Sequence, residues 1–417
     1  MIHFPPALRH RRFSLLWTGL LISMAGSYMQ LSALHWQIRA LSDEPNPIAL
    51  GGIGLARILP VILFSLIGGA VADSLNRRKV LFFTQSGMAL VALALAALTF
   101  QNRIQIWQIY LLTAIQAVAA AFDLPARQAL VPNLVPARDL PNAFSMNSIA
   151  FNTGAILGPA LSGIVIAGLG LGYAYLINAI SFLAVLLALV AIGKVPQARV
   201  PSHRQVVSLS AIRDGWRFIA HRPIILSTML IDFFATFFSS ANTMMPIIAR
   251  DILHVGEVGY GLLSSAQSIG AVSAALVISQ VKIIHRQGLV FLSAVAVFGL
   301  STILFGLATS FWLAMLALFG MGAADSISAI IRNTIRQLNT PDHLRGRMVS
   351  INQIFFMGGP QFGEVEAGIV AKFFGVPFAI VSGGIGCLLA VAWISQRWPQ
   401  IRTYQGDEPA LAATAAD

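Results

Sequence analysis

Twelve apolar stretches, each long enough or nearly long enough to cross a lipid bilayer, dominate this 417-residue sequence. A spanning helix needs about 20 consecutive apolar residues. With 57% hydrophobic and only 10% charged residues, the chain would expose large apolar patches in water. The sequence therefore predicts an all-α membrane protein with twelve transmembrane helices. The stretches cover approximately residues 14–40, 48–72, 79–100, 105–130, 144–168, 173–193, 224–249, 259–281, 288–308, 311–336, 347–373 and 375–396.

The placement of the basic residues predicts the orientation of these helices. The net charge is +11, which by itself would suit a nucleic-acid partner. If the N-terminus lies in the cytoplasm, however, only five of the 27 basic residues fall outside the cytoplasmic segments. This positive-inside pattern predicts that both termini are cytoplasmic and that no nucleic acid is bound. The five exceptions are Arg39, Arg57, Arg103, Arg250 and Lys372.

The two halves of the chain repeat each other. A shift of 205 residues places Arg127 on Arg332 and superposes four pairs of glycines. We therefore predict two pseudo-symmetric six-helix bundles, residues 1–193 and 224–397, with a linker at 194–223 and a cytoplasmic tail at 398–417. Residues 208–220 of the linker read as an amphipathic surface helix. Parallel repeats of this kind favour alternating access, with a substrate site near the midplane. The glycine pairs are Gly154 and Gly359, Gly158 and Gly363, Gly163 and Gly368, and Gly170 and Gly375.

Two motifs resemble those of the major facilitator superfamily, as does the duplicated twelve-helix plan. The first is Gly69-x-x-x-Asp73 followed by Arg77-Arg78-Lys79 between the second and third apolar stretches. The second is the glycine-proline pattern of the superfamily's exporters, in the fifth stretch. The segments 122–135 and 341–347 look like the branch that holds enterobactin exporters and macrolide efflux proteins. The second pattern comprises Gly154, Gly158, Pro159 and Gly163.

The first motif departs from the usual pattern at two positions. Ser74 replaces a common basic residue, which removes one possible ion pair. Asn76 replaces a common glycine, a mild change because Asn tolerates a left-handed turn.

The resemblance implies that the first motif is a cytoplasmic latch. It implies that Asp73 docks on the start of the 347–373 helix, and Arg77 is placed to bond Asp123. Asp123 and Arg127 are four residues apart on one helical face. The alternative is a positive-inside anchor whose charges are solvated. For the glycine-proline pattern, the resemblance implies a bend that seals an exporter's cavity; the alternative is ordinary small-residue packing. The latch residues are Gly69, Asp73, Arg77, Arg78, Asp123 and Arg127.

A polar stripe in the seventh stretch holds the preferred candidate for proton coupling or substrate contact. Asp232, Thr236, Ser239 and Thr243 are spaced four, three and four, so they share one helical face that must look into a cavity or the bundle. The shift of 205 places Asp232 on Ser27, which belongs to a similar stripe in the first stretch. The alternative for Asp232 is a paired structural acid.

Four other residues inside apolar stretches are candidates for the same cavity. Asp325 is the second candidate acid, with Arg332 two turns below it on the same face. Glu364 is the third candidate acid. Arg57 is either a contact for a substrate anion or, as we favour, the partner of an acid such as Glu364. Gln116 stands where the resemblance leads us to expect an arginine, a departure that moves proton coupling to other residues.

The sequence as a whole predicts a secondary active exporter in a bacterial inner membrane, not an enzyme. It has no nucleotide-binding loop, no metal-ligand cluster and a single cysteine, Cys387, so we expect no cofactor and no metal. We expect it to act as a monomer that moves an amphipathic or aromatic small molecule, drug-like or siderophore-like, by antiport with a proton or another coupling ion. A lipid or lysolipid flippase is the alternative within transport. A non-transporting membrane receptor or scaffold is the alternative from another class.

Overall fold

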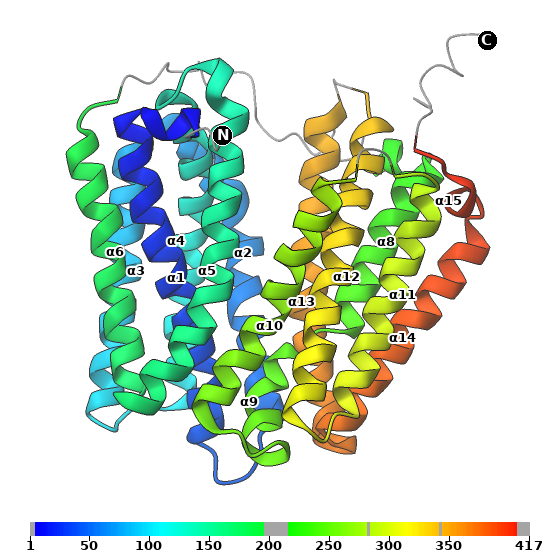
Figure 1. Ribbon diagram of the computed structural model, residues 1–417. Helices are drawn as coiled ribbons and strands as arrows, with labels where there is room; N and C mark the ends of the chain where they lie inside the picture. The colour runs from blue at the N-terminus through cyan, green and yellow to red at the C-terminus, as the bar shows by residue number, and fades with distance from the viewer. Residues whose placement is uncertain (1–4, 196–215, 282–283, 342–343, 407–417) are drawn as a thin grey trace. The chain divides into compact units, whose positions relative to one another are not determined.

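The computed structural model describes residues 5–195, 216–281, 284–341 and 344–406, and these residues form helices and short connections without a strand (Figure 1). Within these ranges, the side chains at 66, 70, 72–73, 241–242, 345–347, 349–350, 353–354 and 357 are outside the description. The predicted all-α class is confirmed. Of the predicted amphipathic helix, residues 208–215 lie outside the described part. Residues 216–220 are helical, and Ile219 is buried in a cluster with Ile225 and Met229.

Contacts group the chain into two compact units. One comprises residues 1–45, 55–206 and 255–265, and the other 46–54, 207–254 and 266–417. The predicted boundaries at 193 and 224 stay a prediction. The helices up to residue 192 are η1 (Pro6–Arg9), α1 (Arg11–Ala40), α2 (Pro47–Ser74), α3 (Arg77–Phe100), α4 (Ile106–Leu130), η2 (Val131–Asn133), η3 (Ala137–Asp139), α5 (Leu140–Gly168) and α6 (Leu171–Ile192). From residue 223 they are α8 (Pro223–Phe238), η4 (Ala241–Met244), α9 (Met245–Ile247), η5 (Ile248–Ile252), α10 (Gly256–Ser279), α11 (Gln287–Gly306), α12 (Phe311–Leu338), α13 (Arg345–Phe374), α14 (Val376–Arg397) and α15 (Gln400–Thr403).

Nine helices in the described ranges are long and apolar enough to cross a membrane. Two further long helices, α1 and α13, have 30 residues each, and α8 is a shorter apolar helix of 16 residues. The exact count of twelve spans therefore stays a prediction. A membrane favours this all-helical construction because helices satisfy their backbone hydrogen bonds internally where no water is available.

The predicted span at 224–249 is not continuous. The α-helix ends at Phe238, and Ser239 and Ser240 follow. The Ser240 hydroxyl bonds the carbonyl of Thr236. The chain continues through a 3₁₀ turn, a short α segment containing Pro246, and a π turn at Ile248–Ile252. Hydropathy alone misses this break because the apolar residues 244–249 follow it closely, although most residues at 239–243 are polar. The predicted stripe on one helical face is therefore wrong beyond Thr236, because Ser239 and Thr243 follow the end of α8.

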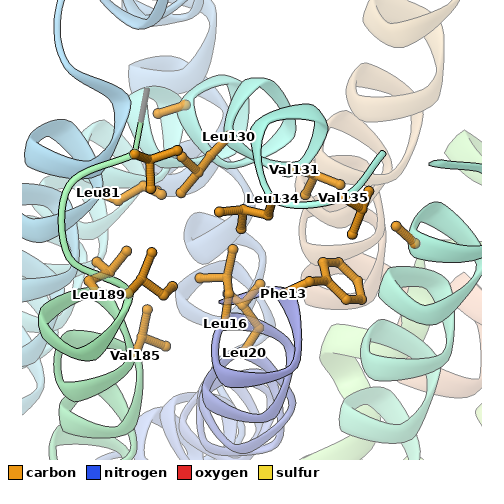
Figure 2. Packing of buried hydrophobic residues seen from close by; sticks show 14 of the residues in the cluster. Phe13, Leu16, Leu20, Leu81, Leu130, Val131, Leu134, Val135, Val185 and Leu189 are labelled. Carbon is orange, nitrogen blue, oxygen red and sulfur yellow. The ribbon is translucent and has the colours of Figure 1, made fainter. Parts of the chain in front are cut away.

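One end of the first unit holds a tightly packed apolar cluster (Figure 2). Its side chains come from η1, α1, α3, α5, α6 and the end of α4 with the turn after it. Phe13, Leu16 and Leu189 are at most 1% exposed. Burying an aliphatic or aromatic side chain is worth about 1.5–3 kcal/mol in water. Within a membrane, close packing of this kind replaces that hydrophobic term as the force that joins helices.

Glycines on α5 let α1 approach closely. A Cβ atom on Gly154 would lie 2.8 Å from the Cβ atom of Met24, and one on Gly158 would overlap Tyr28. The paired helices of the second unit repeat this contact, because Cβ atoms on Gly359 and Gly363 would meet Phe233 and Phe237 of α8.

This packing corrects the alignment of the two halves at their first helices. The contacting partners of the glycines, Met24 and Phe233, are 209 positions apart, as are Tyr28 and Phe237. The glycines themselves are 205 apart. Asp232 therefore corresponds to Ser23, not to Ser27. A four-residue difference is about one helical turn, so both alignments keep the polar stripe on the same face.

We expect Gly158→Ala to destabilise the protein, although alanine is the better helix former by about 1 kcal/mol. Overpacking against Tyr28 should cost about 1–3 kcal/mol and lower the melting temperature of the detergent-solubilised protein. Gly168→Ala is the matched control at the end of the same helix, where a Cβ atom would have no described atom within 4 Å. An unchanged or raised melting temperature for Gly158→Ala would contradict the packing.

Candidate functional site

The second unit contains a cluster of four charged side chains on α8 and α12. Asp232 of α8 forms ion pairs with two arginines of α12: its Oδ1 atom lies 3.1 Å from Arg332 Nη2, and its Oδ2 atom lies 3.3 Å from Arg336 Nη2. Arg332 also forms an ion pair with Asp325, with 3.3 Å between Nη1 and Oδ1. Two acids and two arginines balance to zero charge when all are ionised.

Arg336 is one of the largest fully buried side chains in the described structure. Besides Asp232, it donates to the hydroxyl of Thr228 at 3.2 Å and to the carbonyl of Thr228 at 2.8 Å. Sequence reasoning counted Arg336 among the cytoplasmic basic residues and missed its role. Its spacing of four from Arg332 places both on one face of α12, and this was the available signal.

Asp325 is the accessible member of the cluster. Its side chain is 43% exposed, whereas those of Asp232 and Arg332 are 2% and 5% exposed. Arg332 also donates to Ser328 at 2.8 Å. A small pocket with room for about one water molecule adjoins the cluster. It is lined by Asp232, Ala235, Thr236, Val295, Phe298, Asp325, Ser328 and Arg332.

The structure thus brings together three predicted features, Asp232, Asp325 and Thr236, around one pocket. The predicted proximity of Asp325 and Arg332 is present as an ion pair. The double pairing of Asp232 agrees with the alternative of a structural acid. Which acid carries a proton stays a proposal. Among the described residues, no group of three or more His, Cys, Asp or Glu side chains could hold a metal ion.

Glu364 and Arg57 lie on different helices, α13 and α2, and each is half-buried. Glu364 lies against the start of α2: a Cβ atom on Gly54 would be 2.7 Å from its Oε2 atom. Within the first unit, Arg57 is close enough to Tyr28 and His35 of α1 for its charge to act on both. No described residue of that unit forms an ion pair with it. The pairing of Arg57 with Glu364 stays a prediction.

Gln116 belongs to a neutral polar network in the first unit. It accepts a hydrogen bond from Gln30 of α1, and Asn178 of α6 donates to Gln30 at 2.6 Å. About two turns further along α1, Gln37 donates a hydrogen bond to Thr99 of α3 at 3.0 Å. The network therefore ties α1 to α3, α4 and α6 through uncharged groups. Sequence analysis singled out Gln116, but the partners on α3 and α6 were missed because they are distant in sequence.

Asp123 is the centre of the predicted latch region as the structure describes it. Its carboxylate receives hydrogen bonds from Thr84 at 3.0 Å and Gln85 at 2.7 Å, and it lies 3.5 Å from Arg127. Arg77 was expected to bond Asp123, but its described hydrogen bonds go to the carbonyl of Ala129 and the side chain of Asn133. Asp123 pairs with the arginine four residues along its own helix, and the hydrogen bonds of Arg77 to Ala129 and Asn133 tie α3 to the end of α4 and the turn after it.

The structure describes the surroundings of the remaining latch residues except for the side chain of Asp73. Arg78 donates to the carbonyl of Leu189 at 2.6 Å, which joins α3 to α6. The side chain of Asp73 lies outside the described residues. Gly68, not Gly69, makes the close contact with α4: a Cβ atom on Gly69 would have no described atom within 4 Å. Asn76 is extended, with φ −66°, and caps α3 by accepting from Lys79 N at 3.2 Å. Asn76 therefore does not adopt the left-handed conformation that it would tolerate.

The glycine-proline pattern of α5 packs against the start of α10 within the first unit. A Cβ atom on Gly163 would lie 2.5 Å from the carbonyl oxygen of Glu257, and one on Gly261 would lie 2.7 Å from that of Pro159. Ser265 donates to the carbonyl of Ile156 at 2.8 Å. The pattern therefore produces close helix contact on this face, and its role in sealing a cavity stays a proposal.

We expect Asp232→Asn to cost about 3–5 kcal/mol of stability, because it leaves buried arginines without their counter-charge. The double variant Asp232→Asn with Arg336→Gln removes one charge of each sign and should melt closer to wild type. Thermal unfolding of the detergent-solubilised variants measures this. Asp325→Asn is the control and should have the smaller effect, since Asp325 is 43% exposed. A double variant less stable than Asp232→Asn would contradict the compensation.

Comparison with known proteins places these features in context. A family model described as "transmembrane secretion effector", of the major facilitator type, matches residues 3–411. The chain is 26% identical to the staphyloferrin A transporter of Staphylococcus aureus over 89% of this chain and 93% of that protein. It is 28% identical to the enterobactin exporter EntS of Salmonella typhi over 76% of each. It is 25% identical to the multidrug efflux pump Tap of Mycolicibacterium fortuitum over 88% of this chain and 90% of that protein.

A solved structure shows the same fold. The bacterial homologue of the human lysosomal transporter Spinster, in an inward-facing and unoccupied conformation, superposes with a TM-score of 0.72. The match covers 96% of this chain and 99% of that chain at 14% sequence identity. The predicted resemblance in fold is therefore confirmed.

Proposed function

Since the chain belongs to the transmembrane secretion effector family of the major facilitator superfamily, we propose that it is a secondary active exporter of an amphipathic or aromatic small molecule. The relatives support this class, because their names specify two siderophores and multiple drugs as cargo. These relatives and the apolar helices also support a multi-pass protein of the bacterial inner membrane. We propose that both termini are cytoplasmic and that the cargo moves out of the cytoplasm.

Proton antiport is the energy source in this proposal, and the charged cluster is the observation that carries it. Ionisable groups inside a membrane span are costly and are retained for ion or substrate pathways. Asp232 and Asp325 adjoin one pocket with Arg332 between them. A carboxylate so placed can gain and lose a proton as the protein alternates between its two states. Gln116 and its partners are neutral, so the first unit's network supplies no such group.

Arg57 keeps the role favoured from the sequence, the partner of an acid such as Glu364, and a contact for a negatively charged group of the cargo is the alternative. A half-buried guanidinium in a span is costly without a counter-charge, and either role would supply one. Within the second unit, Thr236 lines the pocket beside Asp232 and Asp325 and is proposed to contact the cargo there. Ser27 of α1 is proposed to contact the cargo from the first unit. Carboxylate or catecholate cargo of the kind that siderophores provide would suit this site.

The latch proposal assigns the Asp123 group to the cytoplasmic side. Asp123 of α4 joins this helix to α3 through hydrogen bonds from Thr84 and Gln85, and it also forms an ion pair with Arg127 of α4. The latch residues proposed around this group are Gly69, Asp73, Arg77 and Arg78, which would act as a switch between the two transport states. The α5 glycines would maintain close packing throughout.

We expect a protonophore to stop export of enterobactin into energised everted vesicles that contain the protein. The expected loss is complete, because antiport has no other driving force once the proton gradient collapses. Vesicles without the protein are the background control. Export that continues unchanged under the protonophore would contradict proton coupling.

We expect an exported compound class to raise the melting temperature of the purified protein. A ligand present at 100 times its Kd stabilises the folded state by about 2.7 kcal/mol. A thermal-shift comparison of enterobactin, erythromycin and a lysophospholipid distinguishes a small-molecule exporter from a lipid flippase. Stabilisation by the siderophore or macrolide supports the exporter, whereas stabilisation by the lysophospholipid alone would favour a flippase.

A further inference from the structure

The two acids of the charged cluster share one arginine, but they differ in whether they have a second cation and in how exposed their side chains are. Arg332 lies 3.1 Å from Asp232 and 3.3 Å from Asp325. Asp232 has a second cation, Arg336, at 3.3 Å. Arg332 is the cation that the structure places against Asp325. Their accessibility differs as strongly, with side-chain exposures of 2% and 43%.

Protonating Asp232 would be costly. It would leave two arginine side chains, 5% and 2% exposed, with only the half-exposed Asp325 as counter-charge. Removing one partner of a buried ion pair is strongly destabilising because the remaining charge is uncompensated. The geometry therefore holds Asp232 in its ionised form.

Protonating Asp325 leaves every buried charge with a partner. Asp232 would still lie between Arg332 and Arg336, so the buried part of the cluster keeps its two ion pairs. The Nη1 atom of Arg332 would keep its hydrogen bond of 2.8 Å to Ser328. Arg332 therefore keeps both a counter-charge and a hydrogen-bond acceptor, which lowers the cost that usually accompanies breaking an ion pair.

The surroundings contain no competing charge in the described structure. From α11, the pocket is lined by Val295 and Phe298, which are apolar. From α10, the backbone of Gln267 packs against Gly322 of α12. From α8, the only charged residue is Asp232. The ionisation of Asp325 therefore depends on Arg332 first and on the rest of the cluster second.

We propose, on the basis of the proton antiport above, that Asp325 is the carboxylate that carries the proton and that Asp232 is a permanently ionised anchor. Arg332 is the positioning residue that both acids share. On uptake, a carboxylate oxygen of Asp325 forms an O–H bond with a proton from pocket water. The cluster then gains one positive charge, and Arg332 is held by Asp232 and Ser328 alone. On release, the proton returns to water and the Asp325–Arg332 ion pair forms again.

Infrared difference spectroscopy of the purified protein in nanodiscs tests the assignment without a substrate. Titration through acidic and neutral pH reveals the C=O stretch of a protonated carboxyl group. We expect one such band to be lost in Asp325→Asn and to be retained in Asp325→Glu, which keeps a carboxyl group. It should also be retained in the charge-balanced double variant Asp232→Asn with Arg336→Gln. Asp139→Asn, at the start of α5, is the control for acids outside the cluster.

The outcomes separate this proposal from the proposed function. A band that survives in Asp325→Asn, or one that disappears in the double variant, overturns the assignment of the proton to Asp325. If Asp325→Asn does not fold, loss of the band in Asp325→Glu overturns it, and retention in both Asp325→Glu and the double variant supports it. Protonophore-insensitive export by the wild-type protein would instead reject proton antiport, whatever the spectra show.

Discussion

The double ion pair of Asp232 with Arg332 and Arg336 is the interaction on which the second unit depends. It joins α8 to α12 across 100 and 104 residues of sequence, in surroundings where both arginines are at most 5% exposed. Charges in such a place are tolerated only when they are paired and hydrogen-bonded. Thr228 and Ser328 supply the additional hydrogen bonds. Because Asp232 already has two cationic partners, Asp325 at the edge of the cluster is the acid that we propose changes its charge.

The first unit has a different ion pair at the positions that correspond to this cluster. Arg127 corresponds to Arg332, but its partner Asp123 lies on the same helix, at the position that Ser328 occupies in the second unit. The helix contacts nearer the middle are made by amides, with Gln30 linking Gln116 and Asn178. One repeat thus keeps its charge near a helix end, while the other brings its charge into the contact between α8 and α12. Duplication preserved the glycine packing of both halves and let their electrostatics diverge.

The long helices could be predicted from sequence because an apolar run in a membrane has few ways to satisfy its backbone. The pairing of Asp325 with Arg332 could also be predicted, since seven residues are about two turns of one helix. The burial of Arg336 could not, because it depends on Thr228 and Asp232 of a distant helix. The break after Phe238 was missed because apolar residues resume at Met244, so the run as a whole still reads as one span. Repeat alignment placed Asp232 one turn away from its packing counterpart, an error that a periodicity of 3.6 conceals.

We propose that transport draws its energy through Asp325, the carboxylate at the edge of the α8–α12 ion cluster. The decisive measurement is transport by Asp325→Asn in proteoliposomes, with wild-type protein in parallel and, as the probe, a compound that the wild-type protein accumulates, enterobactin being tried first. The variant should still exchange this probe across the membrane at equal concentrations but should no longer concentrate it when a pH gradient is imposed. Accumulation by the variant that follows the pH gradient as in the wild type would show that Asp325 does not carry the proton.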